Sequence, residues 1–200
     1  MLYKFIVGFI KPLFYLFFNI EVINKPDIKK NKRLLIAGNH TSWSDPFFLA
    51  ITIKRNISFL AKEELFKWWP VRKILLASGM YPVKRGTPDR KAISFALDIL
   101  KNDKCLGIFP EGTRNKENIG QGHNGTAYFA YKTGTNILPV VIYNKSKNFR
   151  SKVIIKYGDI IEVEKAKRIQ KSKLSELTNI LMKEIKKGMN EIEKKENNIS

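Results

Sequence analysis

The chain contains very little cysteine and histidine: one Cys, Cys105, and two His among 200 residues. One cysteine cannot form a disulfide within the chain, and one Cys with two His cannot supply the usual four ligands of a zinc site. We therefore expect no metal, and a reducing compartment rather than secretion. We also expect Cys105, inside an apolar run, to be an inert core residue.

Acidic residues are also scarce, because 18 Asp and Glu stand against 37 Lys and Arg, for a net charge of +19. Such an excess predicts a partner that is negatively charged over a wide area, either nucleic acid or an anionic membrane surface. No RNA-binding aromatic motif or zinc finger is present. We therefore expect an anionic membrane surface as partner and no nucleic acid.

A long uninterrupted hydrophobic run is missing as well. Residues 1–20 are the most apolar stretch, but Lys4, Lys11 and Pro12 interrupt it. Lys11 near the centre of a bilayer would cost about 2.5–3.5 kcal/mol, and no small-residue cleavage site follows. We predict a membrane-associating segment of two short helical pieces, 1–10 and 13–20, that dip into one leaflet; a helix buried in the core is the alternative. The protein would then be peripheral or monotopic on the cytoplasmic face of the cell membrane.

In residues 21–200, apolar runs typical of strands alternate with helical patterns. This alternation predicts one α/β domain with a mostly parallel central sheet flanked by helices. The expected strands are 33–39, 57–61, 81–84, 105–109, 137–143, 153–157 and 160–163, the last two forming a hairpin across Gly158 and Asp159. The expected helices are 46–53, 63–78 (broken at Pro70), 88–101 (with Pro88 in its first turn), 127–132 and 174–192, followed by a frayed tail.

Loops rich in polar side chains follow three of these strands, and parallel strands bring such loops to one edge of a sheet. The first loop contains His40 and Asp45. A neutral imidazole can take a proton from a hydroxyl when a carboxylate holds its other nitrogen. No Gly-x-Ser-x-Gly elbow is present, so Ser42 and Ser44 are weaker candidates for a nucleophile. A helix-capping Asp45 beside an unrelated surface histidine is the other interpretation.

The other two loops offer groups that suit a phosphate. Arg85, next to Lys84, can form bidentate hydrogen bonds, and Gly112 and Thr113 offer backbone N–H groups and a hydroxyl. A solvated basic turn at residues 84–85 is the simpler interpretation of the first pair. A structural salt bridge between Glu111 and Arg114 is an equally open interpretation of that pair.

An aromatic and basic segment lies between the first two loops. It contains Phe66, Trp68 and Trp69 among Lys62, Lys67, Arg72 and Lys73. Two interpretations remain open: a surface for a membrane interface, or aromatic rings buried against the sheet.

Four motifs give the chain a specific resemblance. NHTSWSDP (39–46), GMYPVKR (79–85), FPEGTRN (109–115) and ILPVVI (137–142) have the order and approximate spacing of the motifs of the glycerophospholipid acyltransferase family, and most resemble its bacterial lysophosphatidic acid acyltransferases. The resemblance implies that His40 is the general base and that Asp45 orients it. It places Pro139 on the acyl-donor side and builds the acceptor's phosphate site from Arg85, Glu111, Gly112, Thr113 and Arg114.

One segment departs from the family pattern. Members commonly have a basic pair where this chain has Gly122, His123, Asn124 and Gly125. We therefore expect His123 to be structural or a weak contact of the acceptor's headgroup.

The resemblance also implies a reaction. An acyl group would pass from acyl-CoA or acyl-acyl carrier protein to the 2-hydroxyl of lysophosphatidic acid, giving phosphatidic acid without a cofactor. The alternatives are another acceptor, such as glycerol 3-phosphate or another lysolipid, and a non-catalytic basic protein that binds membrane or nucleic acid.

Overall fold

The computed structural model describes residues 2–28, 32–53, 55–84, 89–115, 119–144 and 149–198. Its centre is a seven-stranded sheet with the order β1-β7-β6-β2-β5-β3-β4. Neighbouring strands are parallel except β6 and β7, which are antiparallel, so the predicted mostly parallel sheet is confirmed. The strands are β1 (Phe18–Ile23), β2 (Leu34–Gly38), β3 (Ile57–Lys62), β4 (Met80–Val83), β5 (Cys105–Ile108), β6 (Ile137–Asn144) and β7 (Ser151–Tyr157).

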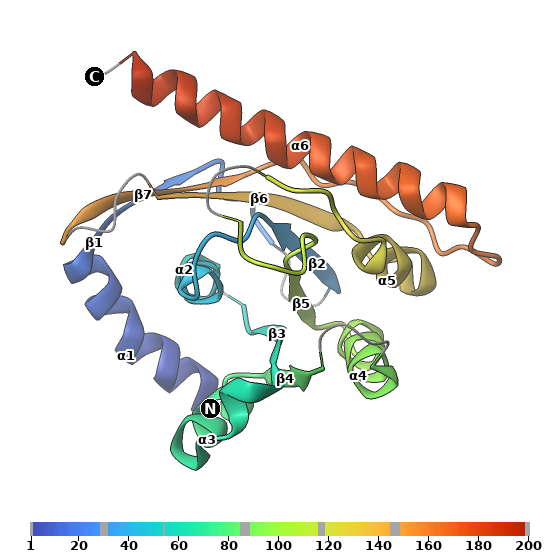
Figure 1. Cartoon of the computed structure of the whole chain (residues 1–200), viewed down its shortest axis with the longest axis horizontal. Helices are drawn as coiled ribbons and strands as arrows, with labels where there is room; N and C mark the ends of the chain where they lie inside the picture. Colours follow the sequence, from blue (N-terminus) through green and yellow to red (C-terminus); the bar gives the residue numbers. More distant parts are fainter. Residues whose placement is uncertain are drawn as a thin grey trace.

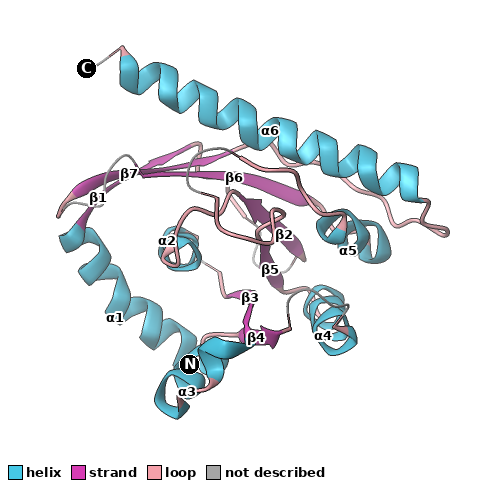
Figure 2. Cartoon of the chain, viewed as in Figure 1, coloured by secondary structure: helices cyan, strands magenta, loops and turns pink. Residues whose placement is uncertain are grey.

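Helices cover both faces of this sheet (Figures 1 and 2). On one face lie α1 and α2, and on the other α4, α5 and the long α6. The helices are α1 (Leu2–Phe17), α2 (Asp45–Thr52), the short 3-10 helix η1 (Glu63–Phe66), α3 (Trp69–Ala77), α4 (Arg90–Lys101), α5 (Gly125–Thr133) and α6 (Lys171–Asn197).

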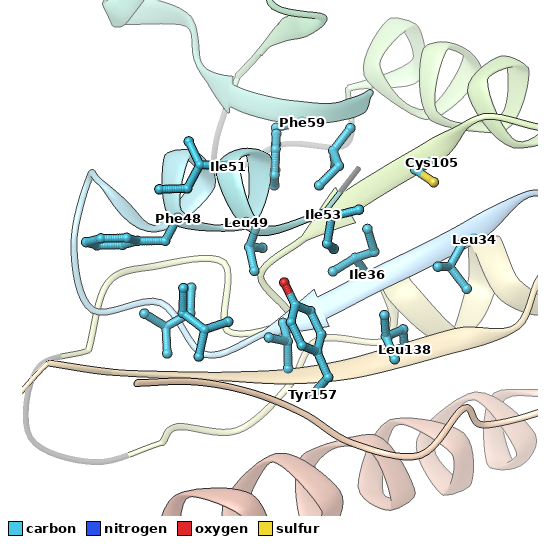
Figure 3. Close-up of a cluster of buried hydrophobic side chains, with 14 of the residues drawn as sticks. Leu34, Ile36, Phe48, Leu49, Ile51, Ile53, Phe59, Cys105, Leu138 and Tyr157 are labelled. Carbon is cyan, nitrogen blue, oxygen red and sulfur yellow. The ribbon is translucent and has the colours of Figure 1, made fainter. Parts of the chain in front are cut away.

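The core on the α2 face surrounds fully buried Phe48, Ile36, Leu138 and Tyr157 (Figure 3). Burying a side chain of this kind stabilises the fold by about 1.5–3 kcal/mol. The Tyr157 hydroxyl lies 2.7 Å from Thr52 Oγ1, and burial raises the pKa of Tyr157. Cys105 belongs to the same core, and burial raises the pKa of its thiol to about 11. The thiol is therefore protonated at neutral pH, as expected of an inert core residue.

The opposite core is closed by α6, which places Leu177, Leu181 and Ile185 against the sheet. The sequence suggested that the chain frays after residue 192. This prediction is wrong, since α6 continues to Asn197. Lys152 on β7 explains the extension: its Nζ lies 2.6 Å from buried Glu196. This contact ties the last turns of α6 to the sheet.

The N-terminal residues form one helix rather than the two short pieces we expected. α1 continues through Pro12, because side chains on both sides of the proline pack on the core. Val7 and Phe14 are two of them, and the Phe14 and Phe48 ring centroids are 5.1 Å apart. β1 begins at Phe18, so the sheet starts before the boundary expected after residue 20.

Within the described ranges, we find no helix that is both long and apolar enough to cross a membrane.

Residues 153–163 do not form the expected hairpin, so that prediction is wrong. Both edges of β7 are occupied, by β6 on one side and β1 on the other, so no position remains for residues 160–163. Ile161 instead forms an isolated antiparallel bridge with Ile137, at the start of β6.

Two of the expected helices begin at other residues than the sequence suggested. The helical pattern at 63–78 divides into η1 and α3, and Pro70 lies in the first turn of α3, where a missing N–H costs nothing. α4 begins at Arg90, after the N-cap residue Asp89, whose carboxylate accepts from the N–H groups of Lys91 and Ala92. Pro88, expected inside that helix, lies outside the described residues.

Candidate active site

His40 and Asp45 form a buried pair in the loop between β2 and α2. His40 Nδ1 lies 2.8 Å from Asp45 Oδ2, and the same oxygen accepts from the N–H groups of Thr41 (2.7 Å) and Ser42 (2.8 Å). Asp45 is the first residue of α2, and its carboxylate turns back into the loop; the N-cap residue is Ser44. The helix-capping interpretation is therefore wrong. A carboxylate acceptor at Nδ1 fixes the tautomer in which Nε2 is free to accept a proton.

The imidazole of His40 stacks on one side against two aromatic rings in succession. It stacks on Phe109 with the ring centroids 4.2 Å apart, and Phe109 stacks on Phe59 at 6.1 Å. The absence of a side chain at Gly107 leaves space for the Phe59 ring, since a Cβ there would lie 2.1 Å from that ring. In the part of the chain that the structure describes, no protein group hydrogen-bonds Nε2 of His40. His40 is only 8% exposed, so these contacts hold its ring in place.

The main chain of His40 is held by the loop after β5. Its N–H donates to Glu111 Oε1 at 3.1 Å, and its carbonyl accepts from the N–H of Asn115 at 2.8 Å. Glu111 Oε2 accepts from Asn115 Nδ2 at 2.6 Å and from the Gly120 N–H at 2.9 Å. Both oxygens of this buried carboxylate therefore bond to N–H donors of the protein. No ion pair between Glu111 and Arg114 occurs in the described chain.

Asn39 positions the same loop, and sequence reasoning assigned it no role. The β2–β6 ladder ends at Gly38, and the Asn39 side chain continues it. Its Nδ2 donates to the Ile142 carbonyl at 2.9 Å, and its Oδ1 accepts from the Ile142 N–H at 2.8 Å. The only signal in the sequence is an asparagine directly after an apolar strand and directly before the histidine.

The two serines of the loop bond to each other. Ser44 Oγ donates to Ser42 Oγ at 2.9 Å, and within the described residues neither hydroxyl hydrogen-bonds His40. This arrangement gives neither serine the base that a nucleophile needs.

The residues expected to bind phosphate, apart from buried Glu111, are of two kinds. Gly112, Thr113 and Arg114 are exposed beside Glu111 and so are open to a ligand. Gly112 has φ of +68°, a conformation that favours glycine, and a Cβ there would lie 3.0 Å from the His123 ring. Arg85 lies outside the described residues.

His123 and Pro139 are the remaining expected residues. His123 is exposed beside the Glu111 loop, and its N–H donates to the Pro110 carbonyl at 2.8 Å. Pro139 is buried in β6 opposite Ala37 of β2, and its carbonyl accepts from the Gly158 N–H at 2.9 Å. Pro139 therefore lies within the sheet rather than on the exposed surface of the loops.

A cavity of about 490 Å³ opens beside these loops, toward α6. Asn39, Thr41 and Glu111 line one side, and Lys186 and Asn190 of α6 line another. The His40 ring is not part of the lining, since it stacks on Phe109, which packs on the α2-side core. The cavity is therefore lined by residues of both loops but not by the imidazole.

The aromatic residues between β3 and β4 differ in burial. Phe66 is buried, as the core interpretation predicted for it. Trp68 and Trp69 are each 66% exposed, so that interpretation is wrong for the tryptophans.

Comparison with known proteins gives consistent results. The acyltransferase family model matches residues 19–143. The chain is 32% identical to the 1-acyl-sn-glycerol-3-phosphate acyltransferase of Borreliella burgdorferi over 181 residues, which cover 86% of this chain and 72% of that protein. It is 25% identical to the enzyme of the same name from Streptococcus pneumoniae, of which the match covers 61%.

A solved structure agrees with these relatives. The fold matches the crystal structure of the 1-acyl-sn-glycerophosphate acyltransferase of Thermotoga maritima with a TM-score of 0.75 and 25% identity, over 96% of this chain and 79% of that one. The family model spans well over half of the chain, and the similarity includes both loops that hold His40. This chain belongs to the acyltransferase family.

Proposed function

We propose that this chain transfers an acyl group from acyl-CoA or acyl-acyl carrier protein to the 2-hydroxyl of 1-acyl-sn-glycerol 3-phosphate (lysophosphatidic acid), giving phosphatidic acid. The observation that carries the proposal is the His40–Asp45 pair, with Nδ1 bound to the carboxylate at 2.8 Å. The names of the relatives supply the acceptor.

The chemistry follows from this pair. Nε2 of His40 takes the proton of the acceptor hydroxyl as its oxygen attacks the thioester carbonyl. The new C–O bond forms, the C–S bond breaks, and the proton passes from the imidazolium to the departing thiolate. Asp45 stabilises the imidazolium while it exists, and no acyl-serine is needed because the thioester is already activated.

Glu111 and Asn115 act in this proposal as positioning residues. They hold the N–H and the carbonyl of His40, so the imidazole keeps one place relative to both substrates. A fixed geometry of this kind lowers the entropic part of the barrier. Glu111 serves the phosphate site by holding its loop, since both of its oxygens already bond the protein.

The acceptor's phosphate binds to Gly112, Thr113, Arg114 and Arg85 in this proposal. The first three are exposed on the loop that holds His40, and the family motif adds Arg85. Guanidinium groups suit a phosphate because they can bond two of its oxygens at once. Pro139 acts on the donor side through the position of β6 rather than by direct contact.

The outer face of α1 suits a membrane. Phe5 (73% exposed), Phe9 (66% exposed), Leu13, Leu16 and Phe17 face away from the core, whereas Val7, Ile10 and Phe14 pack on it. With the net charge of +19, this face supports peripheral attachment to an anionic membrane, on its cytoplasmic side.

A panel of substrates tests the proposed function. Purified protein would receive labelled acyl-CoA or acyl-acyl carrier protein with 1-acyl-sn-glycerol 3-phosphate, glycerol 3-phosphate or a neutral-headgroup lysolipid, and chromatography would resolve the products. We expect phosphatidic acid from the first acceptor as the main product. A faster reaction with either of the others would move the acceptor assignment to that molecule, and no transfer at all would overturn the proposal.

A further inference from the structure

The segment after β3 exposes apolar side chains that a folded protein usually buries. α3, all of which the structure describes, contains no buried residue although most of its side chains are apolar. Phe66, directly before it, is buried and fixes the segment to the core. The exposed apolar side chains, which we call the α3 surface, are Leu65, Trp68, Trp69, Ile74 and Leu76. Five large apolar side chains exposed within residues 65–76 indicate an interaction surface.

Cations surround these side chains. Residues 62–73 carry four basic and two acidic residues, and all four of the basic ones are exposed. Lys73 Nζ lies 5.1 Å from the centroid of the Trp69 ring, a cation–π contact, and Lys62 pairs with Glu64 at 3.1 Å. Tryptophan interleaved with lysine and arginine is typical of protein segments at a membrane–water interface.

The topology brings the α3 surface to the edge of the sheet that carries His40. β2 and β3 are both parallel to β5, so their carboxyl ends lie at one edge. η1 follows β3 directly, and α3 must run from this edge back to the opposite one, because β4 is parallel to β3. Trp68 and Trp69, at the start of α3, therefore lie at the edge from which the His40 loop projects. Trp43 of that loop is itself 70% exposed.

The far end of α3 adjoins α1. Tyr3 and Ile6 of α1 line one small apolar cavity together with Ser78 and Met80, which follow α3. The residues that follow α3 therefore lie beside the first turns of α1.

From these observations we infer that Trp68 and Trp69 anchor the active-site edge of the sheet in the headgroup region of an anionic lipid bilayer. The inference rests on the proposed function only in that the acceptor is a lipid. α1 alone would attach the protein, and the α3 surface adds a second contact that turns His40 toward the lipid. The surplus of cations around the tryptophans favours anionic lipid over a protein partner.

Intrinsic fluorescence tests the insertion directly. The chain has three tryptophans, so a Trp43→Phe variant reports on Trp68 and Trp69 alone. With vesicles of phosphatidylglycerol and phosphatidylcholine, we expect a blue shift of the emission and quenching by lipids brominated near the headgroup. Unchanged emission from protein that sediments with the vesicles would overturn the inference.

A double variant tests the consequence for binding. Trp68→Ser with Trp69→Ser should weaken partitioning onto the same vesicles by at least about tenfold, because two large apolar rings are lost from the contact. Ile180→Ser is the matched control, since Ile180 is an exposed residue of α6, which covers the opposite face of the sheet. Equal partitioning of the double variant and the wild type would contradict the inference.

Activity separates this inference from the proposed function. On a short-chain acceptor below its critical micelle concentration, the double variant should turn over at the wild-type rate, and on acceptor held in vesicles its rate should fall with binding. A wild-type protein that acylates neither form of the acceptor would refute the proposed function, while the fluorescence result would still decide the inference.

Discussion

Glu111 accepts a hydrogen bond at 3.1 Å from the main-chain N–H of His40, a residue 71 positions earlier in the chain. The contact joins the loop after β5 to the loop after β2. It uses a buried carboxylate to hold the backbone of the histidine rather than its ring.

This contact predicts an unusual sensitivity to a conservative substitution. All three partners of Glu111 are N–H donors, so Glu111→Gln sets its own NH₂ group against a donor. We expect kcat to fall by about 10–100-fold with little change in the KM for the acyl donor, since about 1–3 kcal/mol of hydrogen bonding is lost. Steady-state kinetics measure both constants. Glu64→Gln, at an exposed glutamate, is the control, and a Glu111→Gln enzyme with wild-type kcat would refute the positioning role.

Asn39 should matter for stability. Asn39→Ala leaves the N–H and the carbonyl of Ile142 without their buried partner, at a cost of about 1–3 kcal/mol for each group. Urea unfolding followed by circular dichroism measures the loss. Asn102→Ala, which removes an exposed amide that bonds one carbonyl, should change the free energy of unfolding by less than about 1 kcal/mol. Equal effects of the two substitutions would contradict the assigned role of Asn39.

The outer face of α1 should govern membrane attachment. Deleting α1 is a poor test, because Phe14 packs on Phe48 and its loss would damage the core. Phe5→Ser with Phe9→Ser leaves that packing intact and should move protein from the membrane fraction to the soluble one. The remaining association should depend on salt, whereas the wild type should resist high salt and yield to detergent. Release of the wild-type protein by salt alone would show that the attachment is not apolar.

Arg85 should act on acceptor binding. It lies outside the residues that the structure describes, so this prediction rests on the family motif. Arg85→Ala should raise the KM for 1-acyl-sn-glycerol 3-phosphate by about 10–100-fold, the equivalent of one or two charge-assisted hydrogen bonds, with a smaller effect on kcat. Arg85→Lys should recover part of the loss, since it restores charge without the bidentate geometry. A rise confined to the KM of the acyl donor would assign Arg85 to the phosphates of coenzyme A.

Much of the fold could be predicted because most elements carry local signals. The α4 helix shows its apolar spacing, and β5 belongs to a short apolar run, residues 105–110, between Lys104 and Glu111. β1 could not be found this way, since its residues continue the apolar N-terminus. Only its pairing with β7, in which Phe18 lies opposite Ser151, makes it a strand. The false hairpin has the same origin, because nothing local shows that β7 has both edges occupied.

The same holds for the site: a contact between residues close in the chain could be predicted, and contacts between distant residues could not. The His40–Asp45 contact spans five residues; the spacing made the pair a candidate, and the other two loops and the family motifs favoured it over a helix cap. Glu111 stands three residues before Arg114 in the chain, so the sequence pointed to an ion pair between them or to a phosphate site. The fold instead brings Glu111 to the backbone of His40. Asn39 gave no clear signal, because its partner is the main chain of Ile142, 103 residues away.

The turnover of a His40→Ala variant tests the central claim most directly. Circular dichroism should confirm that the variant folds, and saturating acyl-CoA and 1-acyl-sn-glycerol 3-phosphate should remove any effect on binding. Loss of the general base should lower kcat by about 10²–10⁴-fold. Asp45→Asn should be severely impaired too, since a neutral amide cannot stabilise the imidazolium that forms when His40 takes the proton. A His40→Ala enzyme that keeps half of the wild-type kcat would contradict the mechanism.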